Sequence, residues 1–391
     1  MTDNNTLNYV YISPHFPPNF YLFAVNLAKH GVNVLGITDM NDSDINPALK
    51  HAMKAHYRVN SLSDINELKN ACHYFTHHFG KIDFVESHLE SWLENEAKLR
   101  TEFNVEGIKI NDIPNFIRKS RMKKIFQNAD ITTSAGILIK NSQDLLDFVY
   151  ENKFPVIVKP DIGVGAGDTY KISNDEELNR FINSHDIHNR DFFAEKFIEG
   201  TIETFDGLAD KDGNILFCTS LVYSGTLEMK EGAKFYYLRK EMPSDLELVG
   251  KKTVKAFNIK AKFFHIEFFR DFNNNLFGLE INVRPPGGFT TDMINFSADA
   301  DIYNEYANMI KNNSFDTDFK VKYYTGFFAR EDWKTYIYTY DEIFEKYWKN
   351  IVFSGRIPDV FAPLMGNQGF IVRAETYEKI TEIFKYLDKS V

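Results

Sequence analysis

An acid, an amide and a guanidinium alternate in the stretch Glu280-Ile-Asn282-Val-Arg284, which runs directly into Pro-Pro-Gly-Gly. In an extended strand, successive side chains point to opposite faces, so these three share one face. A second carboxylate, Glu267, lies in the preceding apolar run FFHIEFF, and the intervening DFNNN indicates a hairpin turn. Adjacent antiparallel strands can place Glu267 and Glu280 side by side. An edge strand whose polar face meets water would show the same alternation.

Two carboxylates this close repel each other, so we expect either a raised pKa or a cation between them. Oxygen ligands suit Mg²⁺, which proteins hold through one or two carboxylates together with substrate phosphates. Upstream, Lys159 ends the strand-like run VIVKP, and Gly163, Gly165 and Gly167 follow in a loop whose N–H groups could approach a phosphate. Singly, the loop fits an ordinary turn and the lysine a solvated side chain. In this order, they predict a site for a metal-bound phosphate.

The first hundred or so residues alternate apolar runs with amphipathic stretches, which predicts a small doubly wound domain with a parallel sheet. A dinucleotide-binding domain of this kind carries GxGxxG after its first strand, whereas this chain has SPHFPPN there, which excludes a nicotinamide or flavin site. The expected strands are at 9–12, 32–38, HYRV, DFVES and IKIN, and the expected helices are at about 21–30, 64–79 and 89–103.

From Ile113 onward the pattern changes. We expect the basic stretch RKSRMKKIFQNA to be a helix, 154–160 a strand and 174–183 an amphipathic helix. The stretch FFAEKFIEGTIETFDGLAD alternates as an antiparallel sheet does. A helix is expected after Phe289, and the chain closes with a strand, GFIVRA, and a helix, TYEKITEIFKYLDK.

Composition narrows the class of protein. The chain has 391 residues, 43% of them hydrophobic and 26% charged, which is typical of a soluble protein with more than one core. A net charge of −10 argues against nucleic-acid binding. The two cysteines form no CxxC pattern, and the sequence has no signal peptide and no apolar run long enough to span a membrane. We therefore expect a cytoplasmic protein without nucleic-acid or membrane partners.

The order of lysine, glycine loop, carboxylate pair and Asn-x-Arg resembles the ATP-grasp superfamily over about residues 113–310. The nearest resemblance is to the carboxylate-amine ligases, the branch that includes L-amino acid ligases and carnosine synthase, with biotin carboxylase as a more distant relative. It implies a multidomain chain of α/β and α+β type. The implied domains are a doubly wound pre-ATP-grasp domain at 1–112, a small lobe at 113–190, a large lobe at 191–310 and a C-terminal α/β cap completing the large lobe at 311–391.

The resemblance also implies a role for individual residues. Lys119 and Lys159 match the two nucleotide-binding lysines, although Arg118 stands where the family commonly has Asp, and Arg121, Lys123 and Lys124 are alternatives to Lys119. Gly163, Gly165 and Gly167 match the flap over the phosphates. The remaining matches are Glu195, Lys196, Phe197 and Ile198 for the hinge that meets adenine, Glu203 for ribose, Glu267, Glu280 and Asn282 for metal, and Arg284, Gly287 and Gly288 for the substrate carboxylate.

The implied activity is an ATP-dependent ligase that joins a small-molecule carboxylate, such as an amino acid, to an amine through an acyl phosphate. ATP and two Mg²⁺ ions, which Mn²⁺ could replace, are the implied cofactors, and a homodimer is the family expectation. His265, on the face of Glu267, is a candidate to orient the substrate or accept a proton, or else a structural histidine. Asp206, Glu228, Arg330 and the stretch 224–241 are candidates for substrate choice. The alternatives are a carboxylase that uses carboxyphosphate and a nucleotide-binding protein without catalysis.

Overall fold

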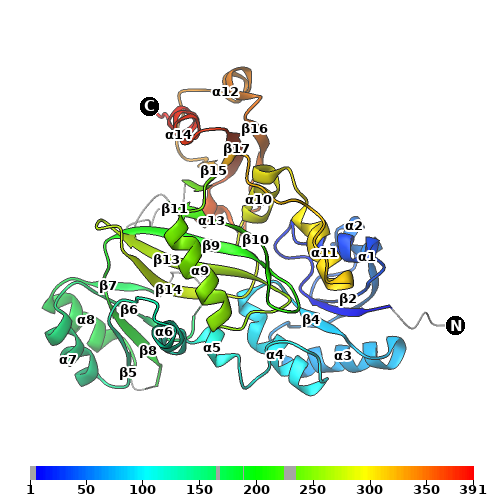
Figure 1. Ribbon diagram of the computed structural model, residues 1–391, viewed down its shortest axis with the longest axis horizontal. Coiled ribbons are helices and arrows are strands. Elements are labelled where there is room, and N and C mark those ends of the chain that lie inside the picture. The colour runs from blue at the N-terminus through cyan, green and yellow to red at the C-terminus, as the bar shows by residue number, and fades with distance from the viewer. Residues whose placement is uncertain (1–5, 164–167, 188, 224–234) are drawn as a thin grey trace.

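The computed structural model describes residues 6–163, 168–187, 189–223 and 235–391. Within these ranges the strands form three sheets: a parallel sheet in the N-terminal domain, a small antiparallel sheet and a large antiparallel sheet (Figure 1). This architecture confirms the predicted combination of a doubly wound domain with α+β lobes. No helix in the described part of the chain has both the length and the apolar character of a membrane span.

The N-terminal domain is a parallel sheet in the order β3-β2-β1-β4. Successive side chains of these strands point to opposite faces of the sheet, and both faces are apolar. Helices α1 and α2 pack against one face, and α3 and α4 pack against the other. The bounds are β1 (Asn8–Ile12), α1 (Tyr21–Lys29), β2 (Asn33–Thr38), α2 (Pro47–Ala52), β3 (Met53–Arg58), α3 (Ile65–Phe79), β4 (Phe84–Glu86), the 3-10 helix η1 (Glu90–Trp92) and α4 (Leu93–Glu102).

The stretch IKIN is not the strand that its composition predicted. The backbone N–H groups of Asp112 and Ile113 both bond to the carbonyl of Lys109, and the N–H of Ile110 bonds to the Thr101 hydroxyl. These bonds form a turn that leads into the next helix, and IKIN therefore does not pair with a neighbouring strand.

The small lobe is an antiparallel sheet in the order β5-β8-β6-β7, whose apolar side chains form a core with α7 and α8. Asn141 and Asn174 cap these two helices, each accepting a bond from a backbone N–H three residues on. The bounds are β5 (Gly136–Ile139), α7 (Ser142–Asn152), β6 (Val156–Pro160), β7 (Tyr170–Ile172), α8 (Asp175–Ser184) and β8 (Phe192–Lys196).

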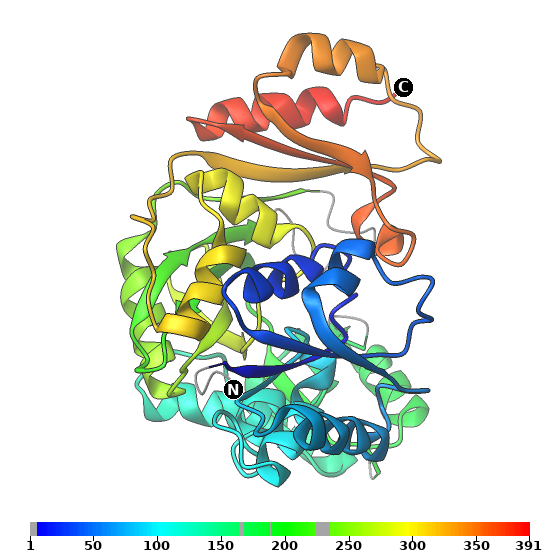
Figure 2. The same cartoon turned by 90° about the vertical axis from the view of Figure 1, so that its right-hand side faces the viewer.

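The large sheet runs in the order β14-β13-β9-β11-β12-β15-β17-β16, with β10 paired to β9. Its strands are β9 (Gly200–Ala209), β10 (Ile215–Thr219), β11 (Leu221–Tyr223), β12 (Phe235–Leu238), β13 (Lys262–Asp271), β14 (Leu276–Asn282), β15 (Tyr324–Arg330), β16 (Ile351–Arg356) and β17 (Gln368–Ala374). The C-terminal strands therefore continue this sheet, and Figure 2 shows them with the last helices at one end of the molecule.

Two groups of helices cover the large sheet. Phe126 of α6 packs with Phe257 and Phe268, so α6 joins the same core as α9, although it precedes the small lobe in sequence. On the other side, α11 packs against α1 of the N-terminal domain (Figure 2). The bounds are α5 (Pro114–Ile117), α6 (Lys119–Asn128), α9 (Ser244–Ala256), α10 (Thr290–Ala298), α11 (Ile302–Asn312), α12 (Tyr340–Tyr347), α13 (Ala362–Met365) and α14 (Tyr377–Leu387).

Candidate active site

The hairpin of β13 and β14 places the two predicted carboxylates directly opposite each other. Glu267 pairs with Glu280, and His265 pairs with Asn282. Directly opposite residues of antiparallel strands share a face, so these four side chains form one polar patch. On the far side of β13, Asp206 of β9 lies opposite His265.

The pKa values of the two carboxylates shift in opposite directions. Burial, followed by the negative charge of Glu267, raises the pKa of Glu280, and Lys119 and Lys159 only partly offset this rise. Burial would also raise the pKa of Glu267, but the hydrogen bond and charge of His265 outweigh it and leave that pKa lowered. The raised pKa expected for closely spaced carboxylates therefore falls on Glu280.

The two predicted nucleotide lysines converge on this pair from outside the large sheet. The Lys119 Nζ lies 3.8 Å from the Glu280 carboxylate and donates to the carbonyl of Gly163 at 3.1 Å. Lys159 is buried at the end of β6, and its Nζ lies 2.6 Å from Glu195. The site therefore gathers positive charge from α6 and the small lobe against negative charge from the hairpin.

One basic alternative to Lys119, Lys123, is held in other contacts, and so is the neighbouring Arg118. The Lys123 Nζ is buried between Glu195, at 2.9 Å, and the Ser134 hydroxyl, at 2.6 Å. Arg118 bonds to Asp161 and Asp191, each at 2.9 Å. Two acids therefore balance the charge of the arginine at this position. Arg121 and Lys124 are exposed on α6.

Beyond β14, Arg284 meets a carboxylate that no sequence motif indicated. Glu90, in η1 of the N-terminal domain, accepts from the Arg284 Nη2 at 3.1 Å. With its amide nitrogen turned toward Glu90, Asn282 donates to the two carboxylate oxygens at 2.9 and 3.3 Å. The only sequence signal for Glu90 is its place just after β4, because ligands gather at the carboxyl ends of parallel strands.

His265 lies between two carboxylates. Its Nδ1 lies 2.6 Å from Asp206 and its Nε2 lies 3.1 Å from Glu267. Burial lowers the pKa of His265, but the two acids outweigh it and raise the pKa to about 9. These contacts suit a residue that orients Glu267, and the role of His265 as a base stays a prediction.

Glu203 is not brought to this patch. In β9 it alternates with Thr204, which lies opposite Glu267, so its side chain points to the other face of the sheet, where Phe205 packs against α9. There Glu203 accepts from Arg239 at 2.8 Å and from Arg270 at 2.9 Å. This placement contradicts the predicted contact with ribose, and the reason is the period of two along the strand.

The predicted hinge connects the small sheet to the large sheet, because it runs from β8 in the small lobe to β9 in the large sheet. The N–H of Lys196 bonds to the carbonyl of Ala135, and the N–H of Phe197 bonds to that of Pro155. Ile198 follows, half-buried, in the same crossing. Glu195 instead serves through its side chain, as the acid between Lys123 and Lys159.

Gly287 and Gly288 lie at the start of α10, beside Arg284. The carbonyl of Gly287 accepts from the Thr290 hydroxyl at 2.8 Å, and Gly288 has a positive φ of 63°. Gly165, Gly167, Glu228 and most of the stretch 224–241 lie outside the described residues. Arg330 does not reach the site, because it is buried and donates to the carbonyls of Leu387 and Tyr338.

The hairpin suits a hard divalent cation that is shared with phosphates. Glu267, Glu280 and Asn282 can offer oxygen donors to such an ion, and the two opposed carboxylates give the hairpin negative charge. In the described residues, no three His, Cys, Asp or Glu side chains form a complete metal cluster. A set of two carboxylates and an amide is what Mg²⁺ takes when a nucleotide supplies the other oxygens.

A family model matches the part of the chain that carries the hairpin, Lys159 and Arg284. The family model of the ATP-grasp domain matches residues 152–292. None of the curated proteins matches the sequence significantly.

Solved structures are similar over nearly the full chain. The L-amino acid ligase from Bacillus licheniformis has a TM-score of 0.77 at 16% identity, covering 98% of this chain and 97% of that one. The ADP complex of N5-carboxyaminoimidazole synthetase from Staphylococcus aureus has a TM-score of 0.69 at 14% identity, with 97% and 96% covered.

A third similar structure is the biotin carboxylase domain of Hydrogenobacter thermophilus 2-oxoglutarate carboxylase, with MgADP, ADP and bicarbonate. Its TM-score is 0.68 at 18% identity, covering 96% of this chain and 88% of that one. At these identities the likeness shows the fold. The chain therefore has the ATP-grasp fold and carries an ATP-grasp domain at residues 152–292.

Proposed function

We propose that the protein is an ATP-dependent ligase that joins a carboxylate, in the first instance that of an amino acid, to an amine through an acyl phosphate. The observation that carries this proposal is the convergence of Lys119 and Lys159 on the Glu267–Glu280 pair, with Arg284 just beyond it. The likeness to an L-amino acid ligase supports the choice of an amino acid. Two Mg²⁺ ions, which Mn²⁺ could replace, and a cytoplasmic homodimer are part of the proposal.

In the first step, a carboxylate oxygen of the acid attacks the γ-phosphorus of ATP, and the bond to ADP breaks. The lysines offset phosphate charge, and Arg284 with the N–H groups of Gly287 and Gly288 would hold the acid. Mg²⁺ bound by Glu267, Glu280 and Asn282 would supply further charge compensation. No protein nucleophile is required.

In the second step, the amine attacks the acyl carbon, the C–O bond to phosphate breaks, and the proton of the amine passes to the departing phosphate. Glu90 of the N-terminal domain bonds to Arg284 at 3.1 Å. We infer that this ion pair fixes the direction of Arg284 toward the acyl phosphate.

Phosphorylation of bicarbonate is the second candidate, because one of the similar structures contains MgADP together with bicarbonate. The same carboxylate site would then form carboxyphosphate. A nucleotide-binding protein without catalysis is the third, and the complete set of lysines, acids and Arg284 argues against it.

The test is phosphate release from Mg²⁺ and ATP with single L-amino acids, with pairs of them and with bicarbonate, followed by mass spectrometry. A ligase gives release that depends on a pair and a product lighter than the pair by one water. Release that depends on bicarbonate would favour the carboxylase. ATP binding without release in any mixture would favour the silent binder.

Glu280→Gln ties that activity to the hairpin. We expect turnover to fall at least about 100-fold, because the variant loses about 3 kcal/mol or more of charge compensation in the transition state. ATP binding measured by calorimetry should persist, since the hinge is untouched. Glu247→Gln, on the exposed face of α9, is the matched control, and an active Glu280→Gln would remove Glu280 from the site.

A further inference from the structure

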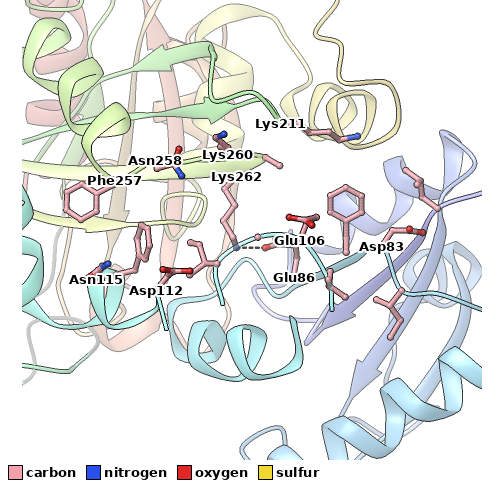
Figure 3. Close-up of a pocket in the computed structure, with 18 of the residues that line it drawn as sticks. Asp83, Glu86, Glu106, Asp112, Asn115, Lys211, Phe257, Asn258, Lys260 and Lys262 are labelled. Atoms are coloured by element: carbon pink, nitrogen blue, oxygen red, sulfur yellow. Dashed lines mark hydrogen bonds and ion pairs between the residues drawn. The ribbon is translucent and has the colours of Figure 1, made fainter. Parts of the chain in front are cut away.

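A cavity of about 770 Å³ lies between the N-terminal domain, α5 and the start of β13 (Figure 3). Small-molecule sites typically have volumes of about 300–1,000 Å³ and lie preferentially at domain interfaces. Its lining in the described chain includes neither the Glu267–Glu280 pair nor Lys119, Lys159 or Arg284. The cavity is therefore separate from the proposed active site.

The wall of this cavity contains a buried ion pair. Lys262 reaches from β13 to Glu86 at the end of β4, and each of the two residues is only 6% exposed (Figure 3). Glu86 also lies 3.0 Å from Arg100, and Lys262 lies 3.2 Å from Glu96. Burying charges costs several kcal/mol per ion unless they are paired and hydrogen-bonded. Glu86 and Lys262 therefore already have partners inside the protein, and the charges open to a ligand are those at the rim of the cavity.

The charges around the cavity balance. Four lysines and four acids line it: Lys81, Lys211, Lys260, Lys262, Asp83, Glu86, Glu106 and Asp112. A phosphate or a polyamine needs an excess of one sign, whereas a zwitterion needs both. Phe116 and Phe257 add apolar walls, which suit an apolar side chain.

We propose that this cavity is a second binding site, for a small zwitterion with an apolar side chain, of the amino-acid or dipeptide class. Its ammonium group would face the rim acids Glu106 and Asp112, and its carboxylate would face Lys211 and Lys260. The site lies at the contact between β4 and β13, the strands that lead to Glu90 and His265. It stands independently of the ligase reaction, because it requires neither ATP nor turnover.

The test is calorimetric titration of the full chain, without ATP, with the twenty L-amino acids and with apolar dipeptides. Ala256→Trp at the end of α9 fills the cavity, and Lys260→Ala removes a rim charge. We expect at least one ligand to bind, and each variant to weaken its binding at least about tenfold. Lys255→Ala, on the same helix and outside the cavity, should leave the binding unchanged.

Two results would overturn the proposal. One is that none of these ligands binds at concentrations up to about 10 mM, where even a weak site would be largely filled. The other is binding that survives both cavity variants but disappears in Arg284→Ala, which would place it in the proposed active site. Lys260→Ala alone decides the matter if Ala256→Trp does not fold, because Lys260 is an exposed side chain.

Discussion

At the scale of single residues, the charge state of the site is set by an unbroken row of groups. Asp206 bonds to His265, His265 bonds to Glu267, and Glu267 lies opposite Glu280. His265 lowers the pKa of Glu267, with smaller contributions from Arg284 and Lys159. Burial raises the pKa of Glu280, and the negative charge of Glu267 adds to that rise. The two carboxylates of the hairpin therefore have pKa shifts of opposite sign.

The raised pKa of His265 predicts a pH-dependent stability. The pKa is 6.5 when unperturbed and about 9 in the folded protein. The stabilisation is therefore complete below about pH 6.5 and is lost as the pH rises toward 9, and it amounts to at most about 3 kcal/mol. Urea unfolding in EDTA, repeated across this range, measures it.

The variant His265→Gln isolates the effect of this histidine, because it removes the titrating group. Its free energy of unfolding should lack this loss between about pH 6.5 and 9. His56→Gln, whose histidine pairs with Asp42 nearer the surface, is the matched control. Equal pH slopes for wild type and His265→Gln would contradict the assigned charge of His265.

At the scale of elements, the turn from β14 into α10 places Gly287 and Gly288 beside Arg284. Gly288 has a φ of 63°, and a Cβ built on it would lie 3.0 Å from the Cε of Met365 and 3.2 Å from the hydroxyl of Tyr236. Glycine is thus required both by backbone conformation and by space. The sequence Pro-Pro-Gly-Gly had indicated a turn, and the structure shows which of its glycines is constrained.

The variant Gly288→Ala should lower the free energy of unfolding by about 1–2 kcal/mol, because alanine is strained at positive φ. It should also raise the KM for the acid more than that for ATP, since the turn lies beside Arg284. Gly287→Ala is the matched control, because nothing lies within 4 Å of a Cβ added there. Equal stabilities of the two variants, from chemical denaturation, would refute the constraint.

At the scale of the whole molecule, the site is assembled from three sheets. The N-terminal domain brings Glu90, the small lobe brings Lys159, and the large sheet brings the carboxylates. A buried network joins the N-terminal domain to the large sheet. It consists of Glu86, Glu96, Arg100 and Lys262. The position of Glu90 therefore depends on how two domains pack together.

The variant Glu90→Ala tests this assembly. Arg284 and Asn282 would lose a shared partner, so we expect kcat/KM for the acid to fall at least about tenfold. ATP affinity and the free energy of unfolding should change little, because Glu90 is far from the hinge in sequence and only partly buried. Glu94→Gln, which affects only an exposed pair with Lys98, is the control. Unchanged kinetics in Glu90→Ala would show that the contact plays no part in the reaction.

Much of the fold and part of the site follow from local patterns. The alternation of FFHIEFF and LFGLEINV with DFNNN between them predicts the hairpin, and hence the pairing of Glu267 with Glu280. The rhythm of the first hundred residues predicts the parallel sheet. These predictions succeed because the period of side chains and the preference of turn residues act within a few residues.

The tertiary structure alone decided which charged groups meet. It brought Glu90 to Arg284, buried Lys123 against Glu195 and paired Glu203 with two arginines on the other face of the sheet. It also set His265 between two acids, which raise its pKa to about 9. The partners in these contacts mostly come from segments far apart in the chain, and the pKa of a buried group depends on the charges that packing places around it.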